Sequence, residues 1–186
     1  SLHDRVGGLL FGGDGRDNVY FRPTKDRRAL WRLLSAMTTD QIEHDESKPG
    51  LLADILRQAA RGSGTGGLVF VIADFNREHE GLVQGLAQLR QRHAVVLVPV
   101  DDPADRDLPD MGDVMFRGPD GELLTVSTGD AAGREAYRQA WQQRRNNLVQ
   151  LANGSGCALI PVDTGADVHA TLMQGLERRL RMRSLL

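Results

Sequence analysis

The stretch that decides the fold is LVFVIADFNRE at residues 68–78, where six apolar residues lead directly into Asp74. A run that is apolar at every position is typical of a parallel strand covered on both faces by helices. Two further runs, AVVLVPV at 94–100 and CALIPV at 157–162, have the same character, and each is also followed by an aspartate. The three runs predict the strands of one buried sheet.

Segments with apolar residues at helical spacing lie between and after these strands. They cover residues 82–89, about 130–153 and 168–180. In the longest of them, the apolar stripe consists of Tyr137, Trp141, Leu148 and Ala152. Strands that alternate with helices in this way predict a mainly parallel sheet with helices on both faces.

The other segments predict smaller elements. Residues 6–11 and 19–21 have the pattern of an antiparallel hairpin, and Pro23 with Thr24 is expected to open a helix. Residues 101–113 read as an acidic loop. A hairpin insertion is expected near 113–127, around the turn Pro-Asp-Gly.

Length and charge limit the classes of protein to which the chain can belong. The chain has 186 residues, a formal net charge of -2 and a pI near 6.2. This suits a single domain over residues 1–186 and gives no attraction to nucleic acid. Because Cys157 is the only cysteine, an internal disulfide is excluded. No apolar run approaches the roughly 20 residues that span a bilayer.

Three predicted strands end in acid, at Asp74, Asp101 and Asp163. In open parallel sheets, ligands bind outside the carboxyl ends of the strands. Carboxylate oxygens suit a hard cation such as Mg²⁺. The other interpretation is that acids simply follow strands in surface loops, and the residues leave both interpretations open.

Charge is unevenly distributed along the chain. Residues 101–122 hold eight carboxylates against two arginines, whereas residues 178–183 are basic. Each segment is typical of a solvated face, and together they suit a bipolar surface for a protein partner. We expect Asp101, Asp102 and Asp163 to contribute to partner binding.

Common catalytic motifs are missing from the sequence. It contains no GxxxxGK[ST] phosphate loop, no GxSxG elbow and no HExxH pair. The glycines at 62–67 precede a strand, so they do not form a dinucleotide-binding turn. Cys157 opens an apolar run, where a thiol usually serves packing.

An ordered set of segments carries a family resemblance. The segments are DRVGGLLF at 4–11, VFVIADF at 69–75, RHAVVLVPVDDP at 92–103, LPDMGDVMFRGPDGE at 108–122, REAYRQAWQQRRNNLVQLA at 134–152 and GCALIPVDT at 156–164. The set resembles the bacterial domain-of-unknown-function family fifty-eight, whose core is similar to a von Willebrand factor A domain. The resemblance covers nearly the whole chain and rests on the order of the segments.

The resemblance implies an α/β fold, a Rossmann-like three-layer sandwich of von Willebrand factor A type. It implies a non-enzymatic protein–protein interaction module that acts with a MoxR-type AAA+ ATPase in assembly or chaperone-like work. It also implies a cytoplasmic domain without a membrane span of its own, in a parent protein that is anchored to the membrane upstream.

The resemblance further implies an incomplete adhesion-type metal site. Such a site uses D-x-S-x-S after the first strand, a Thr before a middle helix and an Asp at the end of the fourth strand. Asp74 matches the Asp, Ser47 stands where the Thr is expected, and the first strand is expected to be missing from this chain. The implied cofactor state is no metal bound in this chain, with Mg²⁺ allowed in the full-length parent.

A missing central strand would leave sheet edges unpaired. We expect the gap to be closed by direct pairing of residues 5–11 with residues 68–73, or by a second chain in a homodimer.

The alternative function is metal-dependent phosphoryl transfer or hydrolysis, with Asp74 as nucleophile or metal ligand. Two departures weaken it. Haloacid-dehalogenase-like enzymes have a second Asp two residues on, where this chain has Asn76, and receiver domains have an acidic pair at an earlier strand end, where it has Gly12.

Overall fold

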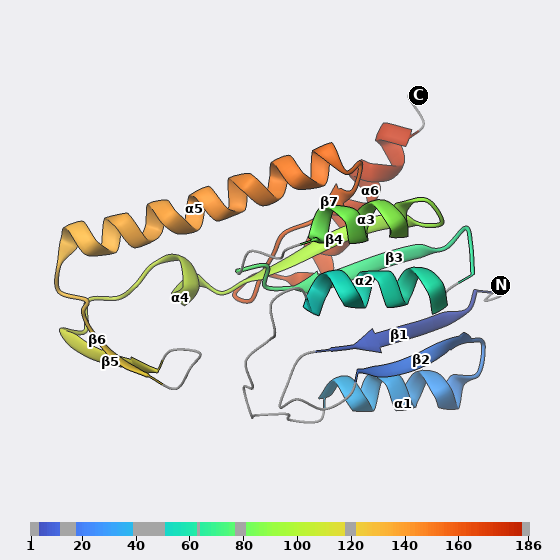
Figure 1. Ribbon diagram of the computed structural model, residues 1–186, viewed down its shortest axis with the longest axis horizontal. Helices are drawn as coiled ribbons and strands as arrows, with labels where there is room; N and C mark the ends of the chain where they lie inside the picture. The colour runs from blue at the N-terminus through green and yellow to red at the C-terminus, as the bar shows by residue number, and fades with distance from the viewer. Residues whose placement is uncertain are drawn as a thin grey trace. The chain divides into compact units, whose positions relative to one another are not determined.

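The computed structural model describes residues 4–11, 18–38, 51–62, 64–76, 81–117 and 122–183. The chain divides into two compact units. Figure 1 labels their helices and strands in chain order. The first unit holds residues 1–67 and 79–92, and the second holds residues 68–78 and 93–186.

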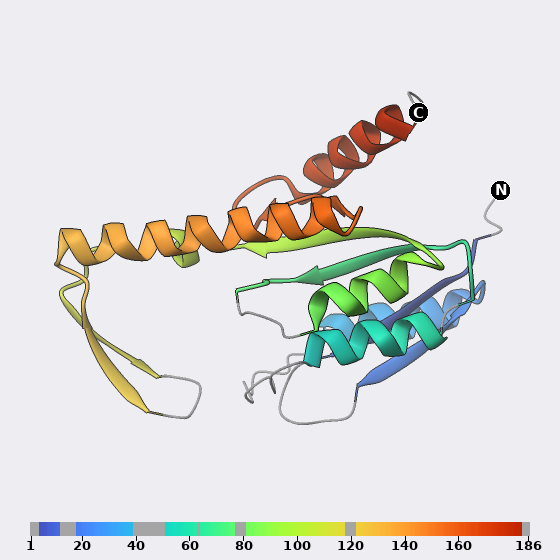
Figure 2. The same cartoon turned by 45° about the horizontal axis from the view of Figure 1, so that its top comes forward.

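The first unit contains an antiparallel ribbon and helices. Strand β1 (Val6–Leu10) pairs with β2 (Val19–Thr24), as the sequence predicts. The helices are α1 (Arg27–Thr38), α2 (Leu51–Gly62) and α3 (Leu82–Arg90). Helix α1 contacts the ribbon, where the Leu33 side chain lies against Gly8, and α2 packs beside α3 (Figure 2).

Helix α1 begins later than its predicted start at Pro23, because β2 continues through Thr24. The Oγ1 of Thr24 accepts a hydrogen bond from Asp26 N at 3.1 Å. The Oδ1 of Asp26 accepts one from Arg28 N at 3.0 Å. A short carboxylate that binds a free amide of the first turn is an N-cap, so Asp26 starts the helix.

The second unit is built on a parallel sheet, which confirms the mainly parallel arrangement. Strand β3 (Leu68–Ala73) pairs with β4 (Ala94–Asp101). On the other side of β4 lie β7 (Ala158–Leu159) and β8 (Val162–Asp163), both parallel to it. These two short strands replace one predicted strand, because Pro161 between them has no N–H for the ladder.

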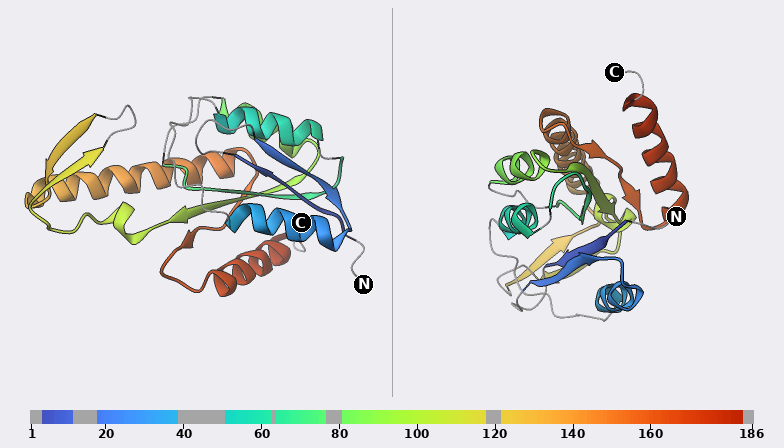
Figure 3. Two further views of the ribbon diagram at one scale, coloured as in Figure 1. Left: turned by 90° about the horizontal axis from the view of Figure 1, so that it is seen from below. Right: turned by 90° about the vertical axis from the view of Figure 1, so that its right-hand side faces the viewer.

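Helices α5 (Ala131–Gly154) and α6 (Val168–Arg183) cover opposite faces of this sheet (Figure 3). On one face, Val96 and Val98 pack with residues of β7–β8 and of α6; these residues are Ala158, Ile160, Val162, Leu172 and Leu176. Side chains alternate between the faces of a strand, so Asp101 belongs to the other face. There, Arg145 of α5 binds it.

An arm connects β4 to α5. It contains the short helix α4 (Pro103–Arg106) and the hairpin of β5 (Asp113–Arg117) and β6 (Leu123–Ser127), which forms where the sequence places it. Thr128, only 1% exposed, closes the base of the hairpin. The hairpin precedes the N-terminal end of α5, and burial within α5 begins only at Trp141.

Among the described strands, β1 pairs with β2, and β3 pairs with β4. The direct pairing of residues 5–11 with residues 68–73 would join the first unit to the second and stays a prediction. A hairpin partner is favoured for β1, since closing a short loop costs less conformational entropy than joining distant segments. Closure by a second chain stays a prediction.

Candidate functional site

Three of the predicted site residues lie together at the carboxyl ends of β4 and β8. Asp101 and Asp163 are register partners across the two strands. Thr164 joins the strand ends, because its N–H donates to Asp101 O at 2.9 Å and its hydroxyl donates to Asp102 Oδ2 at 2.8 Å. The expectation that parallel strands bring these acids to one edge therefore agrees with the structure.

Two of these acids also bind the backbone that follows them. The Oδ1 of Asp102 accepts a hydrogen bond from Ala104 N at 2.8 Å and caps α4. This bond, helped by the Thr164 hydroxyl, holds the pKa of the Asp102 carboxyl below its ordinary value of 3.8. The Oδ1 of Asp163 accepts from Gly165 N at 2.7 Å.

A buried arginine forms the centre of the site. The Nε of Arg145 donates to Asp101 Oδ1 at 2.6 Å. Its Nη2 donates to Asp74 O at 2.8 Å and to Asn76 Oδ1 at 2.9 Å, and its Nη1 donates to Phe75 O at 3.4 Å. The side chains of Arg145 and Asp101 are 9% and 14% exposed. Removing one partner of a buried ion pair typically costs about 3–5 kcal/mol.

Asp74 takes part in this network through its backbone and not through its carboxylate. Its carbonyl binds Arg145, whereas its side chain is at an exposed residue and accepts a hydrogen bond from Asn76 N at 3.3 Å. The next residue, Phe75, is buried with a φ of 52°. A left-handed backbone at a bulky residue is strained, so the surrounding contacts hold this turn in place.

The residues that the structure describes do not assemble an adhesion-type metal site around the Asp74 carboxylate. The oxygens that converge at this strand end surround the guanidinium of Arg145. Within the described ranges, no three His, Cys, Asp or Glu side chains gather closely enough to hold a metal ion. Ser47 and the segment before α2 lie outside the described residues.

Sequence reasoning missed Arg145, although a pattern in α5 indicates it. Its buried residues are Trp141, Arg145, Leu148 and Ala152, at spacings of four, three and four. Arg145 therefore lies on the apolar stripe of the helix. The Trp141 ring lies under the guanidinium, 5.3 Å from its carbon to the ring centroid, at a distance typical of a cation–π contact. A charged residue on such a stripe points to a buried partner.

The β5–β6 hairpin is a second feature of this unit. Directly opposite residues share a face, so Val114 and Phe116 of β5 lie on the same face as Val126 and Leu124 of β6. On this face, the pair nearest the tip of the hairpin is Phe116 and Leu124, and these side chains are exposed by 37% and 59%. Exposed carboxylates flank the ribbon at Asp107, Asp110, Asp113 and Glu122. An apolar face with an acidic rim is typical of an interaction surface.

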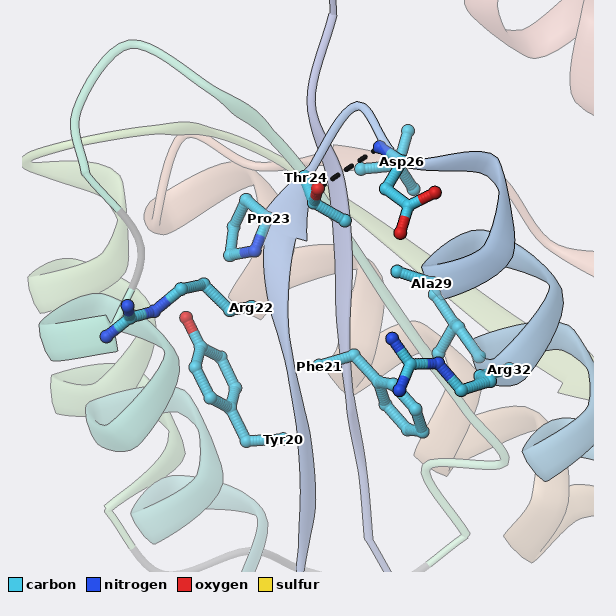
Figure 4. Close-up of a pocket in the computed structure, with 10 residues that line it drawn as sticks. Tyr20, Phe21, Arg22, Pro23, Thr24, Asp26, Ala29 and Arg32 are labelled. Atoms are coloured by element: carbon cyan, nitrogen blue, oxygen red, sulfur yellow. Dashed lines mark hydrogen bonds between the residues drawn. The ribbon is translucent and has the colours of Figure 1, made fainter.

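A cleft of about 540 Å³ lies beside β2 and α1 in the first unit (Figure 4). Its polar side chains do not converge. Tyr20 and Arg22 lie on one side of β2, and Phe21 and Arg32 lie on the other. The Tyr20 hydroxyl donates to Gly62 O at 2.7 Å, which is a structural contact with the end of α2. We assign no ligand to this cleft.

In the part of the chain that the structure describes, every helix is too short or too polar to cross a membrane.

The fold and the site define an α/β domain with a parallel sheet, an arginine-centred acidic strand end and an exposed hairpin. The chain belongs to the family described as "Protein of unknown function DUF58", which matches residues 1–147. This confirms the family that the ordered segments predict.

The chain is similar to several mycobacterial proteins that are named as uncharacterized. Proteins of Mycobacterium bovis and Mycobacterium tuberculosis are each 25% identical over 181 residues, which cover 96% of this chain and 55% of the relative. One of Mycobacterium avium is 27% identical over 128 residues, with coverage of 69% and 73%. The chain thus spans about half of the length, 55%, of the Mycobacterium bovis and Mycobacterium tuberculosis proteins.

Two solved structures share the fold. The conserved hypothetical protein BatB from Bacteroides thetaiotaomicron has a TM-score of 0.52 at 16% identity, covering 96% of this chain and 80% of that one. An aerotolerance-related membrane protein from Bacteroides fragilis has a TM-score of 0.54 at 18% identity, covering 96% and 81%. At these identities the likeness concerns the fold alone.

Proposed function

We propose that this chain is a non-enzymatic protein–protein interaction module of von Willebrand factor A type. In this proposal it acts in the cytoplasm with a MoxR-type AAA+ ATPase, in assembly or chaperone-like work. The observation that carries the proposal is the β5–β6 hairpin, which exposes apolar side chains within an acidic segment.

The hairpin has the anatomy of a binding surface. Leu123 and Met115, on the face opposite to Leu124, are also exposed, by 62% and 64%. Apolar residues at the centre of an interface supply most of the affinity, whereas rim charges steer the encounter. The acidic rim at the strand end and along the arm favours a partner with an apolar groove bordered by Lys and Arg.

The experiment measures binding of the chain to a purified MoxR-type ATPase of the same organism by isothermal titration calorimetry. The test variant is Leu124→Asp. The control is Val149→Asp, at an exposed apolar position of α5 outside the hairpin (43% exposed). We expect Leu124→Asp to weaken binding at least about tenfold, or about 1.4 kcal/mol, and the control to bind as the wild type does.

Added salt should lower the affinity of the wild-type chain, because a charged rim is screened. Unchanged binding by Leu124→Asp, or no binding by the wild-type chain, would contradict the proposal.

The exposed carboxylate of Asp74, beside the strained Phe75, is the observation that favours the alternative, a metal-dependent phosphoryl-transfer or hydrolase domain. The discriminating assay is hydrolysis of p-nitrophenyl phosphate with Mg²⁺. Turnover that Asp74→Asn abolishes would favour the enzyme and overturn the interaction module.

A further inference from the structure

Four oxygen atoms at the ends of β3 and β4 accept hydrogen bonds from the guanidinium of Arg145. They are the Oδ1 of Asp101, the Oδ1 of Asn76 and the backbone carbonyls of Asp74 and Phe75. Carboxylate, amide and carbonyl oxygens are the ligands of hard cations such as Ca²⁺ and Mg²⁺. In this chain, the guanidinium of Arg145 lies among them.

Arginine suits this place for physical reasons. Its guanidinium is always charged, is planar with five N–H donors and is more weakly hydrated than an ammonium group, so its burial is less costly. The Trp141 ring one turn earlier in α5 supports it from one side. Because the charge is part of helix α5, it is present whenever the helix is docked on the sheet.

The arginine also fixes the turn that follows β3. Three consecutive residues, 74 to 76, contribute acceptors to it, and the left-handed Phe75 lies in their middle. In a metal-dependent adhesion site, the strand-end Asp contributes its carboxylate to a metal. Here Asp74 gives the buried cation its carbonyl instead, which is where the structure departs from the family resemblance.

We infer that Arg145 is a positioning residue that replaces a divalent cation at this strand end. Its fixed positive charge neutralises Asp101 and holds the turn at 74–76. The acidic surface is therefore assembled without metal. This inference deepens the proposed function, since it makes partner binding through this surface independent of divalent cations.

The experiment compares thermal melting of the whole chain in EDTA with melting in millimolar Mg²⁺ or Mn²⁺. The variants are Arg145→Met, Arg145→Lys and the control Arg138→Met. Arg138 lies on the same helix, is exposed and pairs with Glu135. Amide hydrogen exchange at residues 74–76 is measured in parallel, because it reports on the turn and requires no partner.

We expect the wild-type melting temperature to be the same in EDTA and in either metal. In Arg145→Met, exchange at 74–76 should speed up by about tenfold or more, because local opening no longer breaks the arginine contacts. Arg145→Lys keeps the charge but loses the planar guanidinium. Its exchange rate at residues 74–76 should lie between the rates of Arg145→Met and the wild-type chain. Arg138→Met should behave as the wild type does.

Two results would overturn the inference. The first is stabilisation of the wild-type chain by Mg²⁺ or Mn²⁺, which would show that a metal holds the strand end. The second is unchanged exchange at 74–76 in Arg145→Lys, which remains informative if Arg145→Met does not fold. Neither measurement includes the ATPase. If the ATPase does not bind the chain, the inference about Arg145 still stands. If the inference about Arg145 fails, the identity of the partner is still untested.

Discussion

Thr128 anchors the hairpin that the proposed function relies on, and Thr128→Val tests that anchor. The hydroxyl of Thr128 accepts a hydrogen bond from Met111 N at 2.9 Å and donates to Gly112 O at 2.8 Å. Valine keeps the shape and removes both bonds. Gly112 O keeps its bond from Thr128 N at 2.7 Å, so the main loss falls on the Met111 amide.

An unsatisfied donor costs about 1–3 kcal/mol, and we expect the hairpin to be destabilised by about 2 kcal/mol. Its opening equilibrium should then rise by roughly 30-fold, since 1.4 kcal/mol is a factor of ten. The assay is hydrogen exchange of the β5 and β6 amides, with thermal melting of the whole chain as a second readout. Thr128→Ser is the control, because it keeps the hydroxyl.

The reasoning is refuted if the β5 and β6 amides of Thr128→Val exchange as slowly as those of Thr128→Ser. Slow exchange in Thr128→Val together with fast exchange in Thr128→Ser would instead assign the anchor to packing of the threonine methyl group.

Two further predictions concern α6 and the strand end. Gly175→Ala should destabilise the chain by about 1 kcal/mol in urea unfolding, because overpacking costs about 1–3 kcal/mol and exceeds the gain in helix propensity of about 1 kcal/mol. The new Cβ would lie 2.7 Å from Ile160 Cγ2, whereas Gly154→Ala at the end of α5 meets nothing within 4 Å and should show no loss. The Asp102 cap should contribute stability above pH 3.8, the ordinary pKa, and lose it as the pH falls through its lower pKa in the folded chain. A carboxyl NMR titration with a midpoint at or above 3.8 would contradict this, and Thr164→Val should move the midpoint upward.

The parallel sheet could be predicted from the sequence because its signal is strong and local. The β3 and β4 runs are apolar without interruption, which is typical of parallel strands. Burial on both faces is confirmed for β4 and is wrong for β3, where Leu68, Phe70 and Ile72 are exposed by 48%, 41% and 54%. The hairpin near 113–127 could also be predicted, because a Pro-Asp-Gly turn lies between two apolar segments. Residues 101–113 were expected to form an acidic loop, and the short helix α4 within them was not predicted. Its start at Asp102 and Pro103, a cap followed by proline at the first helical position, was a signal for it.

The centre of the site could not be predicted with the same rules. Its hydrogen bonds join Arg145 to residues that are separated from it by 44 to 71 positions in the sequence. No local sequence pattern indicates contacts between residues so far apart in the chain. Arginine is usually an exposed residue, so its place on the α5 stripe was overlooked. The predicted start of α1 was wrong for a local reason. Pro23 suits the first turn of a helix and also an edge strand, and the cap at Asp26 decided the outcome.

Helix α5 has 24 residues, so it is about 36 Å long, and about 15 Å of it precedes the first buried residue. The hairpin that leads into this segment contributes nothing to the core against α6, whose members all lie in β4, β7–β8 and α6 or between them. Mutations at the hairpin tip should therefore cost little folding free energy, whereas the buried positions of β4 are constrained by packing. The arm can diversify among relatives while the scaffold stays the same. Grafting the tip of one relative onto another should exchange their partners and leave their melting temperatures unchanged.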